Sequence, residues 1–291
     1  MRKFTAGLID VFADEPFGGN PLAVVEDADG LSDAQMRRIA GEFNQAETTF
    51  LMRSDRADRA LRSFTANGSE VFGAGHNALG AWLWLGEHGL LGPLDTPRTF
   101  RQQIGTDVLP ITLVNADGRV HGRMKQAPLR LSPPLDATDA LADALGLARA
   151  DVMPFPAPRA ADTGAAHLMV RLRDAAAVDS AAPSATALLS VLRAAGAEGC
   201  YVYAFDPDSP DTAYARFFNP TVGLWEDAAT GTAAGPLCAL LGAEGLLNAE
   251  RTLVVEQGVK MGRRSCLHVR LTPEPELSGT GIVVLRGILA F

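Results

Sequence analysis

Lysine, cysteine and long hydrophobic runs are scarce in this chain of 291 residues. Only three of its 26 basic residues are lysines, and none lies at the two Gly-rich turns of the chain, so a Schiff-base mechanism has little support. No window approaches 18 uninterrupted apolar residues, and we therefore expect no membrane-spanning helix. The N-terminal segment reads as a strand, because its apolar run is short and no signal-peptide cleavage pattern follows.

Charge and metal-ligand spacing exclude further classes of protein. The net charge of −8 comes without any basic tract, which argues against nucleic acid or an anionic membrane as partner. The three cysteines are far apart and odd in number, as expected for buried thiols in a reducing cytoplasm. The five histidines show no H-x-x-x-H spacing and the cysteines no C-x-x-C pair, so no metal site is predicted.

The most informative feature is a loose internal repeat. Residues 63–80 (SFTANGSEVFGAGHNALG) are echoed by residues 217–236 (FFNPTVGLWEDAATGTAAGP). Both copies run from an R-x-F-[TN] element through an acidic residue into a small Gly-rich turn, and an apolar helical segment follows. A turn that is built twice with ionisable residues predicts two halves that close one site between them.

The hydrophobic pattern predicts the same order of elements in both halves. We expect strands at 7–12, 22–25, 47–52, 60–65, 168–172, 200–205, 214–218, 253–255, 265–271 and 281–285. We expect helices at 78–85, 185–195 and 237–241, and one that starts with the capping-box pair Ser32 and Gln35 and ends near Asn44. Alternating strands and helices predict an α/β or α+β architecture.

The domain boundaries follow from the repeat. Residues 1–125 are the expected N-terminal lobe and 135–279 the expected C-terminal lobe. Residues 126–134 contain three prolines and are the expected linker. Residues 280–291 are expected to return to the first lobe, as terminal strands often do when they are tied into a sheet.

The two helices that follow the turns are apolar on every face and are expected to be buried. Their first N–H groups have no intrahelical acceptor and attract anions. The glycines Gly73, Gly75 and Gly231 let a ligand approach the backbone closely. A small carboxylate-bearing molecule is therefore the expected ligand.

The ionisable residues at the turns indicate acid–base chemistry. His76 lies at one turn and Asp227 at the other, with Glu47 and Glu226 as further acids. A partly buried carboxylate beside a histidine is a usual general acid–base pair. Each residue also has a purely structural interpretation: His76 as a cap or core residue, Glu47 as a surface or capping acid, and Glu226 and Asp227 as acids that favour a helix start.

A dinucleotide site is the rival interpretation. Residues 73–78 (GAGHNA) fit G-x-G-x-x-G/A, and Glu87 or Asp95 is within range of a ribose-binding acid. Against this, the second copy of the turn lacks the spaced glycines. Residues 89–98 also read as a loop, where a Rossmann unit needs a parallel strand soon after the helix.

Motifs across nearly the whole chain resemble the PhzF family of isomerases, which is named for phenazine biosynthesis. They are DVFADEPFGGNPLAVV at 10–25, NQAETTF at 44–50, the R-x-F-T element at 62–65, GAGHNALG at 73–80, EDAATGTAAG at 226–235 and EQGVKMGRRS at 256–265. The resemblance implies a diaminopimelate epimerase-like α+β (α/β) fold. Such a fold has two pseudo-symmetric lobes, each a curved, mostly antiparallel sheet around a central buried helix. It also implies a homodimer that uses no cofactor.

The same resemblance implies roles for individual residues. Glu47 corresponds to the carboxylate that shuttles a proton, and His76 and Asp227 to groups that bind substrate and tune the transfer. Reactions of the trans-2,3-dihydro-3-hydroxyanthranilate isomerase type take a proton from one carbon of a cyclic amino acid and return it at another. The residues expected to contact substrate are Asn20, Gly73, Ala74, Gly75, Thr230, Gly231 and Thr232.

Departures from the fold family limit the chemistry. The epimerase branch places a cysteine pair where this chain has Ala74 and Thr230, so two-base racemisation is disfavoured and a one-base shift by Glu47 is expected. Asn77 and Ala78 replace a Pro-Thr pair common in the family, which leaves the substrate open. An amino-acid epimerase or racemase and a non-catalytic metabolite-binding relative stay as alternatives. Proline is costly inside a helix. We therefore expect the apolar helix after the second turn, which contains residues 237–241, to begin near Thr232, with Pro236 close to its first turn.

Overall fold

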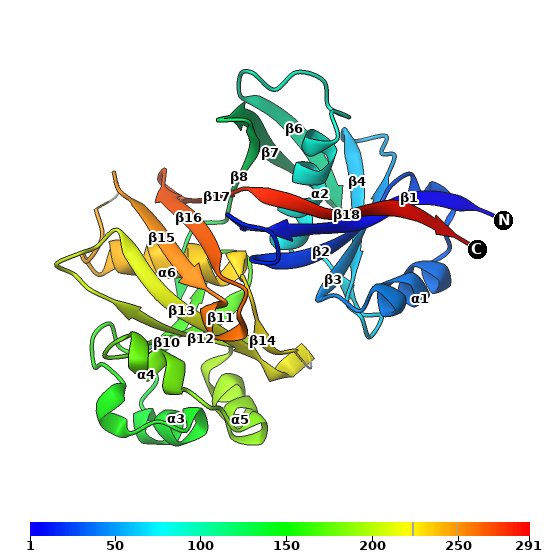
Figure 1. Cartoon of the computed structure of the whole chain (residues 1–291). Helices are drawn as coiled ribbons and strands as arrows, with labels where there is room; N and C mark the ends of the chain where they lie inside the picture. Colours follow the sequence, from blue (N-terminus) through cyan, green and yellow to red (C-terminus); the bar gives the residue numbers. More distant parts are fainter. Residues whose placement is uncertain (223, 249) are drawn as a thin grey trace. The chain divides into compact units, whose positions relative to one another are not determined.

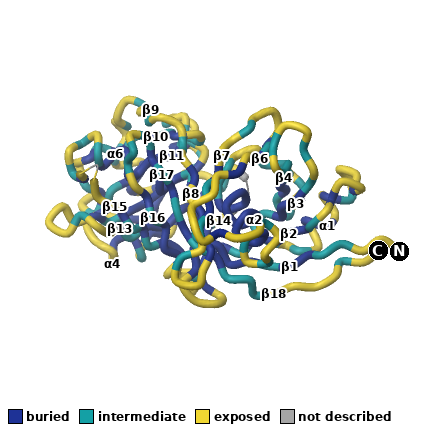
Figure 2. The backbone as a smooth tube through the Cα atoms, turned by 90° about the horizontal axis from the view of Figure 1, so that it is seen from above, coloured by how far each residue is buried: buried dark blue, intermediate teal, exposed yellow. Residues whose placement is uncertain are grey.

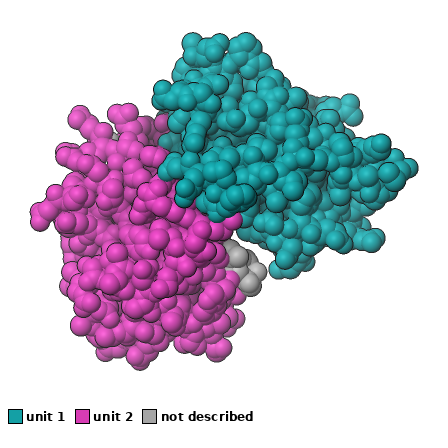
Figure 3. Space-filling view, in the orientation of Figure 1, with its two compact units in different colours: residues 1–125, 278–291 teal, residues 126–277 magenta. Residues whose placement is uncertain are grey.

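The computed structural model describes residues 1–222, 224–248 and 250–291. The chain forms two compact units (Figure 3): unit 1 comprises Met1–Lys125 and Ser278–Phe291, and unit 2 comprises Gln126–Leu277. The Pro-rich residues 126–134 belong to unit 2, where β9 (Arg130–Leu131) pairs antiparallel with β10 (Arg159–Asp162). Among the described residues, no helix has the length and apolar character that a membrane crossing requires.

Unit 1 is a mostly antiparallel sheet with two helices (Figure 1). Its strands are β1 (Lys3–Val11), β2 (Asn20–Val25), β3 (Glu47–Met52), β4 (Arg59–Phe64), β5 (Glu70–Val71), β6 (Arg98–Ile104), β7 (Asp107–Ala116), β8 (Arg119–Lys125) and β18 (Gly281–Ala290), and its helices are α1 (Asp33–Phe43) and α2 (His76–Glu87). The pairs β2–β3 and β4–β6 are parallel, whereas β1–β2, β3–β4, β4–β5, β6–β7 and β7–β8 are antiparallel. The C-terminal strand β18 pairs antiparallel with β1, so the two chain ends lie side by side.

Unit 2 repeats this order. Its further strands are β11 (Ala166–Arg171), β12 (Gly199–Phe205), β13 (Thr212–Asn219), β14 (Leu224–Asp227), β15 (Thr252–Gln257) and β16 (Ser265–Leu271), while β17 (Pro275–Gly279) spans the boundary in sequence. Its helices are α3 (Thr138–Leu145), α4 (Ala175–Ser180), α5 (Ala185–Ala195) and α6 (Gly231–Ala243). Single 3-10 turns lie at η1 (Ala28–Gly30), η2 (Arg149–Asp151), η3 (Pro220–Val222) and η4 (Val259–Met261). The parallel pairs are β11–β12 and β13–β15, which correspond in order to β2–β3 and β4–β6.

The strand registers fix which residues of the two units are counterparts. In β3–β4 the residue after Glu47 lies opposite Phe64, and in β12–β13 the residue after Gly199 lies opposite Phe218. Phe64 and Phe218 are the third residues of the two R-x-F-[TN] elements. Glu47 of unit 1 and Gly199 of unit 2 are therefore counterparts.

Each unit encloses one helix almost completely (Figure 2). Residues 76–85 of α2 are all buried, and so are most residues of α6 between its start and residue 241. The polar edges of the α2 indoles are satisfied inside the unit: Trp82 Nε1 donates to Gln102 Oε1 at 3.0 Å and Trp84 Nε1 to Glu26 Oε1 at 2.8 Å. The prediction from uniform apolar character is confirmed for both helices.

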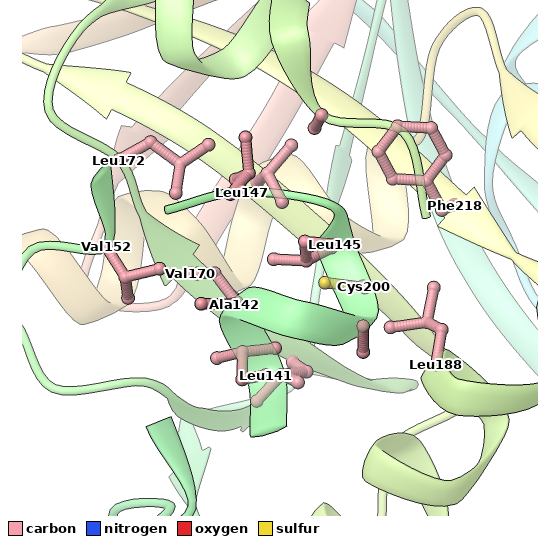
Figure 4. Packing of buried hydrophobic residues seen from close by; sticks show 14 of the residues in the cluster. Leu141, Ala142, Leu145, Leu147, Val152, Val170, Leu172, Leu188, Cys200 and Phe218 are labelled. Atoms are coloured by element: carbon pink, nitrogen blue, oxygen red, sulfur yellow. The ribbon is translucent and has the colours of Figure 1, made fainter. Parts of the chain in front are cut away.

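The remaining helices cover one face of each sheet with an apolar stripe. In unit 2, Leu141 and Leu145 of α3 and Leu188 of α5 pack on Val170 and Phe218 (Figure 4). In unit 1, one face of α1 packs on Phe50 and Phe64 through Met36, Ile39 and Ala40. This layering of a sheet between a buried and an amphipathic helix is the predicted α+β (α/β) architecture.

Several local predictions are confirmed to the residue. The strands at 47–52 and 265–271 and the helix at 185–195 have the predicted bounds. Ser32 Oγ accepts a hydrogen bond from the Gln35 backbone N–H, and Gln35 Oε1 accepts one from the Ser32 backbone N–H, so the capping box forms. Asn44 is the C-cap of α1. These signals are local in sequence, which is why they can be read without the tertiary structure.

The predicted start of α6 near Thr232 is confirmed to within one residue, and Pro236 lies one position further into the helix than that start implies. Helix α6 begins at Gly231 with Thr230 as its N-cap, so Pro236 is the sixth helical residue and lies past the first turn. Proline has no N–H, and the Thr232 carbonyl four residues earlier therefore receives no bond from it. The neighbouring Gly231 carbonyl accepts a bond of 2.8 Å from Gln126 Nε2, which supports this end of the helix from outside.

The loop predicted after α2, which argued against a dinucleotide site, is confirmed except for its last residue, Arg98, which begins β6. Residues 88–97 are a loop as predicted, but β6 follows and pairs parallel with β4. The other neighbours of β6 and β7 are antiparallel, whereas a dinucleotide fold needs a doubly wound parallel sheet. The mostly antiparallel sheet of unit 1 therefore excludes that fold on different grounds.

Candidate active site

Glu47 and His76 lie together in unit 1. Glu47 is the first residue of β3 and His76 the first residue of α2. The distance from His76 Nδ1 to Glu47 Oε2 is 3.7 Å, and the two side chains are 9% and 17% exposed. The fold therefore brings the predicted carboxylate and the predicted imidazole within reach of one small molecule.

The imidazole of His76 is neutral at pH 7. Burial lowers the pKa of His76 from 6.5 to about 4, so its contact with Glu47 is not an ion pair. Its Nε2 atom has no hydrogen-bond partner among the residues that the structure describes. A buried polar atom normally has a partner, and one without points to a ligand group or a water molecule.

The turn before α2 is held by a residue of the helix itself. Asn77 is buried, and its Oδ1 accepts the Gly75 N–H at 2.8 Å while its Nδ2 donates to the Gly73 carbonyl at 3.0 Å and to Ser63 Oγ at 3.1 Å. The sequence pattern linked Asn77 to substrate identity, because the family commonly has proline there. Its hydrogen bonds give it a different role, because they fix the shape of the turn that carries Gly73, Ala74 and Gly75.

An arginine–glutamate pair precedes the turn in both units. In unit 1, Arg62 Nε and Nη2 donate to the two carboxylate oxygens of Glu70 at 2.7 and 2.8 Å. In unit 2, Arg216 does the same to Glu226 at 2.8 and 2.9 Å. Glu226 thus belongs to a bidentate pair, and the interpretation of this residue as an acid that favours a helix start is wrong.

Asp227 faces away from that pair, because successive side chains of a strand point to opposite sides. Its Oδ2 atom accepts the Thr230 hydroxyl at 2.6 Å, and Asp227 is only 7% exposed. Asp227 therefore lies at the start of α6, as predicted, with one carboxylate oxygen directed at the N-cap residue.

Gln257 of β15 holds the turn before α6 from a distance. Its Nε2 donates to the Asp227 carbonyl at 2.8 Å and to Thr230 Oγ1 at 3.0 Å, and its Oε1 accepts from Tyr201 Oη at 2.8 Å and from the Thr230 N–H at 3.2 Å. All four bonds are buried. The sequence pattern did not mark this residue as a positioning group, although it lies in the EQG motif of the family.

The loop after Gln257 completes this support. Ser265 Oγ donates to the Ala228 carbonyl at 2.8 Å. Gly258 has a φ of +76°, and a Cβ there would lie 2.6 Å from the same carbonyl oxygen. Only glycine fits such a left-handed position so close to another backbone segment.

The remaining predicted contact residues lie at the same two helix starts or next to them. In unit 1, Gly75 is the N-cap of α2, Gly73 and Ala74 precede it, and Asn20 is the first residue of β2, the strand beside β3. In unit 2, Thr230 is the N-cap of α6 and Gly231 and Thr232 are its first two residues. The first N–H groups of a helix have no acceptor within it, so both starts present donors to an anionic group.

Gly199, the counterpart of Glu47, has no side chain that could act as an acid or a base. A Cβ at Gly199 would lie 2.3 Å from Cζ of Phe217, so the phenyl ring fills the place of a side chain. Within the part of the chain that the structure describes, no group of three or more His, Cys, Asp or Glu residues is arranged to hold a metal ion. Of the two counterparts, only Glu47 carries an acid–base group.

Comparisons with known proteins show which sequences and structures this chain resembles. The sequence is 34% identical to trans-2,3-dihydro-3-hydroxyanthranilate isomerase from Pseudomonas chlororaphis over 97% of this chain and 98% of that protein. The structure matches that of a predicted epimerase from Pseudomonas aeruginosa with a TM-score of 0.85 and 31% identity over 99% of both chains. It also matches a hydroxyproline epimerase from Agrobacterium vitis with a TM-score of 0.66 over 100% of this chain and 93% of that one, at 13% identity, which shows the shared fold alone.

The two repeated units and their paired turns thus define a protein of the epimerase-like fold whose relatives are named as isomerases. The family model for phenazine biosynthesis-like proteins, PhzC-PhzF, matches residues 9–287, and the chain belongs to that family. The predicted family, fold and enzyme class, an isomerase, are confirmed.

Proposed function

We propose that this protein is an isomerase that moves a proton between two carbons of a small, carboxylate-bearing, amino-acid-derived metabolite, with Glu47 as the single acid–base group. The reaction is of the trans-2,3-dihydro-3-hydroxyanthranilate isomerase type. The observation that carries the proposal is the buried pair of Glu47 and a neutral His76 whose Nε2 has no partner in the described chain.

The asymmetry between the units supports one base rather than two. A racemase needs a proton donor and a proton acceptor on opposite faces of the substrate. The counterpart of Glu47 is Gly199, and Ala74 and Thr230 replace the cysteine pair of the epimerase branch. One carboxylate that both takes and returns the proton fits this set of residues.

The proton balance is simple. The Glu47 carboxylate takes a proton from a carbon of the substrate and becomes a carboxylic acid, while the electrons of the broken C–H bond move into the conjugated system. The same carboxylic acid then returns a proton at a different carbon, and the double bond shifts. Nothing is oxidised or reduced, so the step consumes no cofactor.

His76 and Asp227 have supporting roles in this proposal. His76 is neutral, so it can donate a hydrogen bond to a substrate oxygen or accept one from a substrate amine without adding charge. Asp227 and the first residues of α6 are proposed to bind substrate, and the proposed contact residues are Asn20, Gly73, Ala74, Gly75, Thr230, Gly231 and Thr232. The N–H groups at the two helix starts suit its carboxylate.

Incubation with trans-2,3-dihydro-3-hydroxyanthranilate in heavy water tests the proposal. We expect a product of rearranged double bonds that carries solvent deuterium at the newly protonated carbon, detected by mass spectrometry and NMR. Deuterium at the α-carbon with loss of chirality and no shift of the double bond would identify an epimerase. Calorimetric binding without any deuterium incorporation would identify a non-catalytic metabolite-binding protein.

We also propose that the enzyme works as a homodimer in the cytoplasm. The dimer is the expectation from the family. The free, buried cysteines Cys200, Cys238 and Cys266 fit a reducing compartment, and burial raises the pKa of the Cys238 thiol to about 12, which makes it unreactive. Sedimentation equilibrium gives the mass in solution, and a value equal to the 30.7 kDa of one chain would contradict the dimer.

A further inference from the structure

A buried histidine in unit 2 has no equivalent in unit 1. His167 lies opposite Gly199 in the β11–β12 register, and Leu22 lies opposite Glu47 in β2–β3, so His167 and Leu22 are counterparts. Leu22 is fully buried, and His167 is 3% exposed. An apolar side chain is therefore enough for the fold at this position, and unit 2 has a polar ring instead.

The ring of His167 contacts one of the proposed substrate-binding residues. His167 Nε2 lies 3.1 Å from Thr232 Oγ1. The ring also packs edge-on against Phe217, with centroids 4.9 Å apart and an interplanar angle of 82°. Its other nitrogen, Nδ1, has no hydrogen-bond partner among the described residues.

These contacts decide where the single ring proton lies. Burial lowers the pKa of His167 to about 4, against a smaller opposing effect of the Asp162 carboxylate, which itself accepts a bond from Arg130. The ring is therefore neutral at pH 7 and has one N–H. A proton on Nδ1 would be a buried donor without an acceptor, whereas a proton on Nε2 is donated to Thr232 Oγ1.

We propose that His167 is a positioning residue that donates to the Thr232 hydroxyl and thereby leaves the hydroxyl proton for an acceptor on the substrate. The acceptor has the chemistry of a carboxylate oxygen, and this step rests on the proposed function. Without the histidine the hydroxyl rotates freely and loses part of its value as a donor. His167 itself does not touch the reacting atoms.

A double-mutant cycle tests this role by its kinetics. We expect His167→Leu, which copies the leucine of unit 1, to raise KM about 10-fold with kcat little changed, as for the loss of one hydrogen bond to a charged group. Thr232→Val should have a similar effect, and the double variant should be no worse than Thr232→Val alone. His167→Gln, whose amide can still donate, should restore most of the loss. His121→Leu is the matched control.

Other outcomes overturn the proposal. Effects of His167→Leu and Thr232→Val that multiply in the double variant would mean that His167 does not act through Thr232. A wild-type KM in His167→Leu, or a proton on Nδ1 in the 15N spectrum of the wild-type imidazole, would also contradict it. If His167→Leu does not fold, the 15N spectrum of the wild-type imidazole decides, because a proton on Nε2 is expected and a proton on Nδ1 contradicts the proposal.

Binding measurements separate this inference from the proposed function. The same substitutions are placed in a Glu47→Gln background, and the dissociation constant of 3-hydroxyanthranilate, a stable aromatic carboxylate, is measured by calorimetry. We expect the same weakening of about 10-fold without any turnover. An active Glu47→Gln enzyme would refute the proposed base and leave the His167 measurement intact. Unchanged binding in His167→Leu would refute only the inference on His167.

Discussion

The two units share a strand order and an arginine–glutamate pair, yet the equivalent strands β3 and β12 start differently: Glu47 in unit 1 has Gly199 as its counterpart in unit 2. Where unit 1 places a carboxylate, unit 2 places the ring of Phe217. His167 in turn replaces the apolar Leu22 of unit 1. A repeated scaffold can thus keep its packing in both copies while the two copies carry different side chains, and in the proposed function one copy supplies the acid–base group and the other supplies binding groups.

The turns also differ in how they are held. In unit 1 the bracing residue, Asn77, is the second residue of the helix that follows the turn. In unit 2 the bracing residue, Gln257, comes from a strand 27 residues beyond Thr230 and is tied to Tyr201 on another strand. The turn beside the proposed base is therefore held by local contacts, and the turn beside Asp227 depends on the folding of the whole unit.

The largest loss of stability is expected from breaking the arginine–glutamate ion pair, which occurs once within each unit. Arg216 and Glu226 are 8% and 11% exposed, and Arg216 Nη1 also donates to three backbone carbonyls at the end of α4, those of Val178, Asp179 and Ala181. Arg216→Met removes the bidentate partner of a nearly buried carboxylate and the three bonds to these carbonyls, and we expect a loss of about 3–5 kcal/mol in urea unfolding. The more exposed Arg62, at 27%, should cost only about 1 kcal/mol when changed to Met. Equal losses would contradict the difference in burial.

The next prediction concerns Gly199, where the ring of Phe217 occupies the space that a side chain would take. A methyl group at Gly199 meets the phenyl ring at 2.3 Å, and we expect Gly199→Ala to lower the free energy of unfolding by about 1–3 kcal/mol. The second substitution Phe217→Leu should recover part of the loss. Gly287→Ala is the matched control, because a Cβ at Gly287 meets nothing within 4 Å. A neutral Gly199→Ala would show that space for a side chain exists there.

An effect that depends on pH compares the buried histidines, one in each unit. Burial lowers the pKa of both His76 and His167 from 6.5 to about 4, so between these values the unfolded chain binds protons that the folded chain does not. Their contribution to stability is therefore fully present above pH 6.5 and is lost as the pH falls toward 4, by up to about 1.4 kcal/mol per pH unit for each histidine. His76→Leu and His167→Leu should each flatten the dependence of melting temperature on pH. A variant with the wild-type slope would mean that its histidine is not buried in the folded chain.

Many helices and strands of this protein could be predicted from sequence patterns, because its strongest signals are local. The capping box at Ser32, the β-branched strand that begins at Glu47 and the uniformly apolar α2 and α6 depend on neighbours within a few residues. The resemblance to a family then assigned roles to Glu47, His76 and Asp227. Each of these residues lies at a strand end or a helix start, as the patterns predicted.

What sequence patterns missed depends on contacts between distant segments. Gln257 contacts Tyr201 across 56 residues, and His167 contacts Thr232 across 65. No periodicity marks such pairs, because each residue fits the pattern of its own strand or helix without reference to the distant partner. The support of the Gly231 carbonyl by Gln126, 105 residues earlier, is likewise not a local signal.

Whether one carboxylate moves the proton is decided by Glu47→Gln measured in heavy water beside Glu42→Gln, an exposed glutamate of α1 that serves as the matched control. We expect Glu47→Gln to fold and to bind 3-hydroxyanthranilate, while the incorporation of deuterium from solvent into product falls by about two to four orders of magnitude. Glu42→Gln should incorporate deuterium at the wild-type rate. Incorporation by Glu47→Gln at that same rate would contradict the assignment of Glu47 as the base.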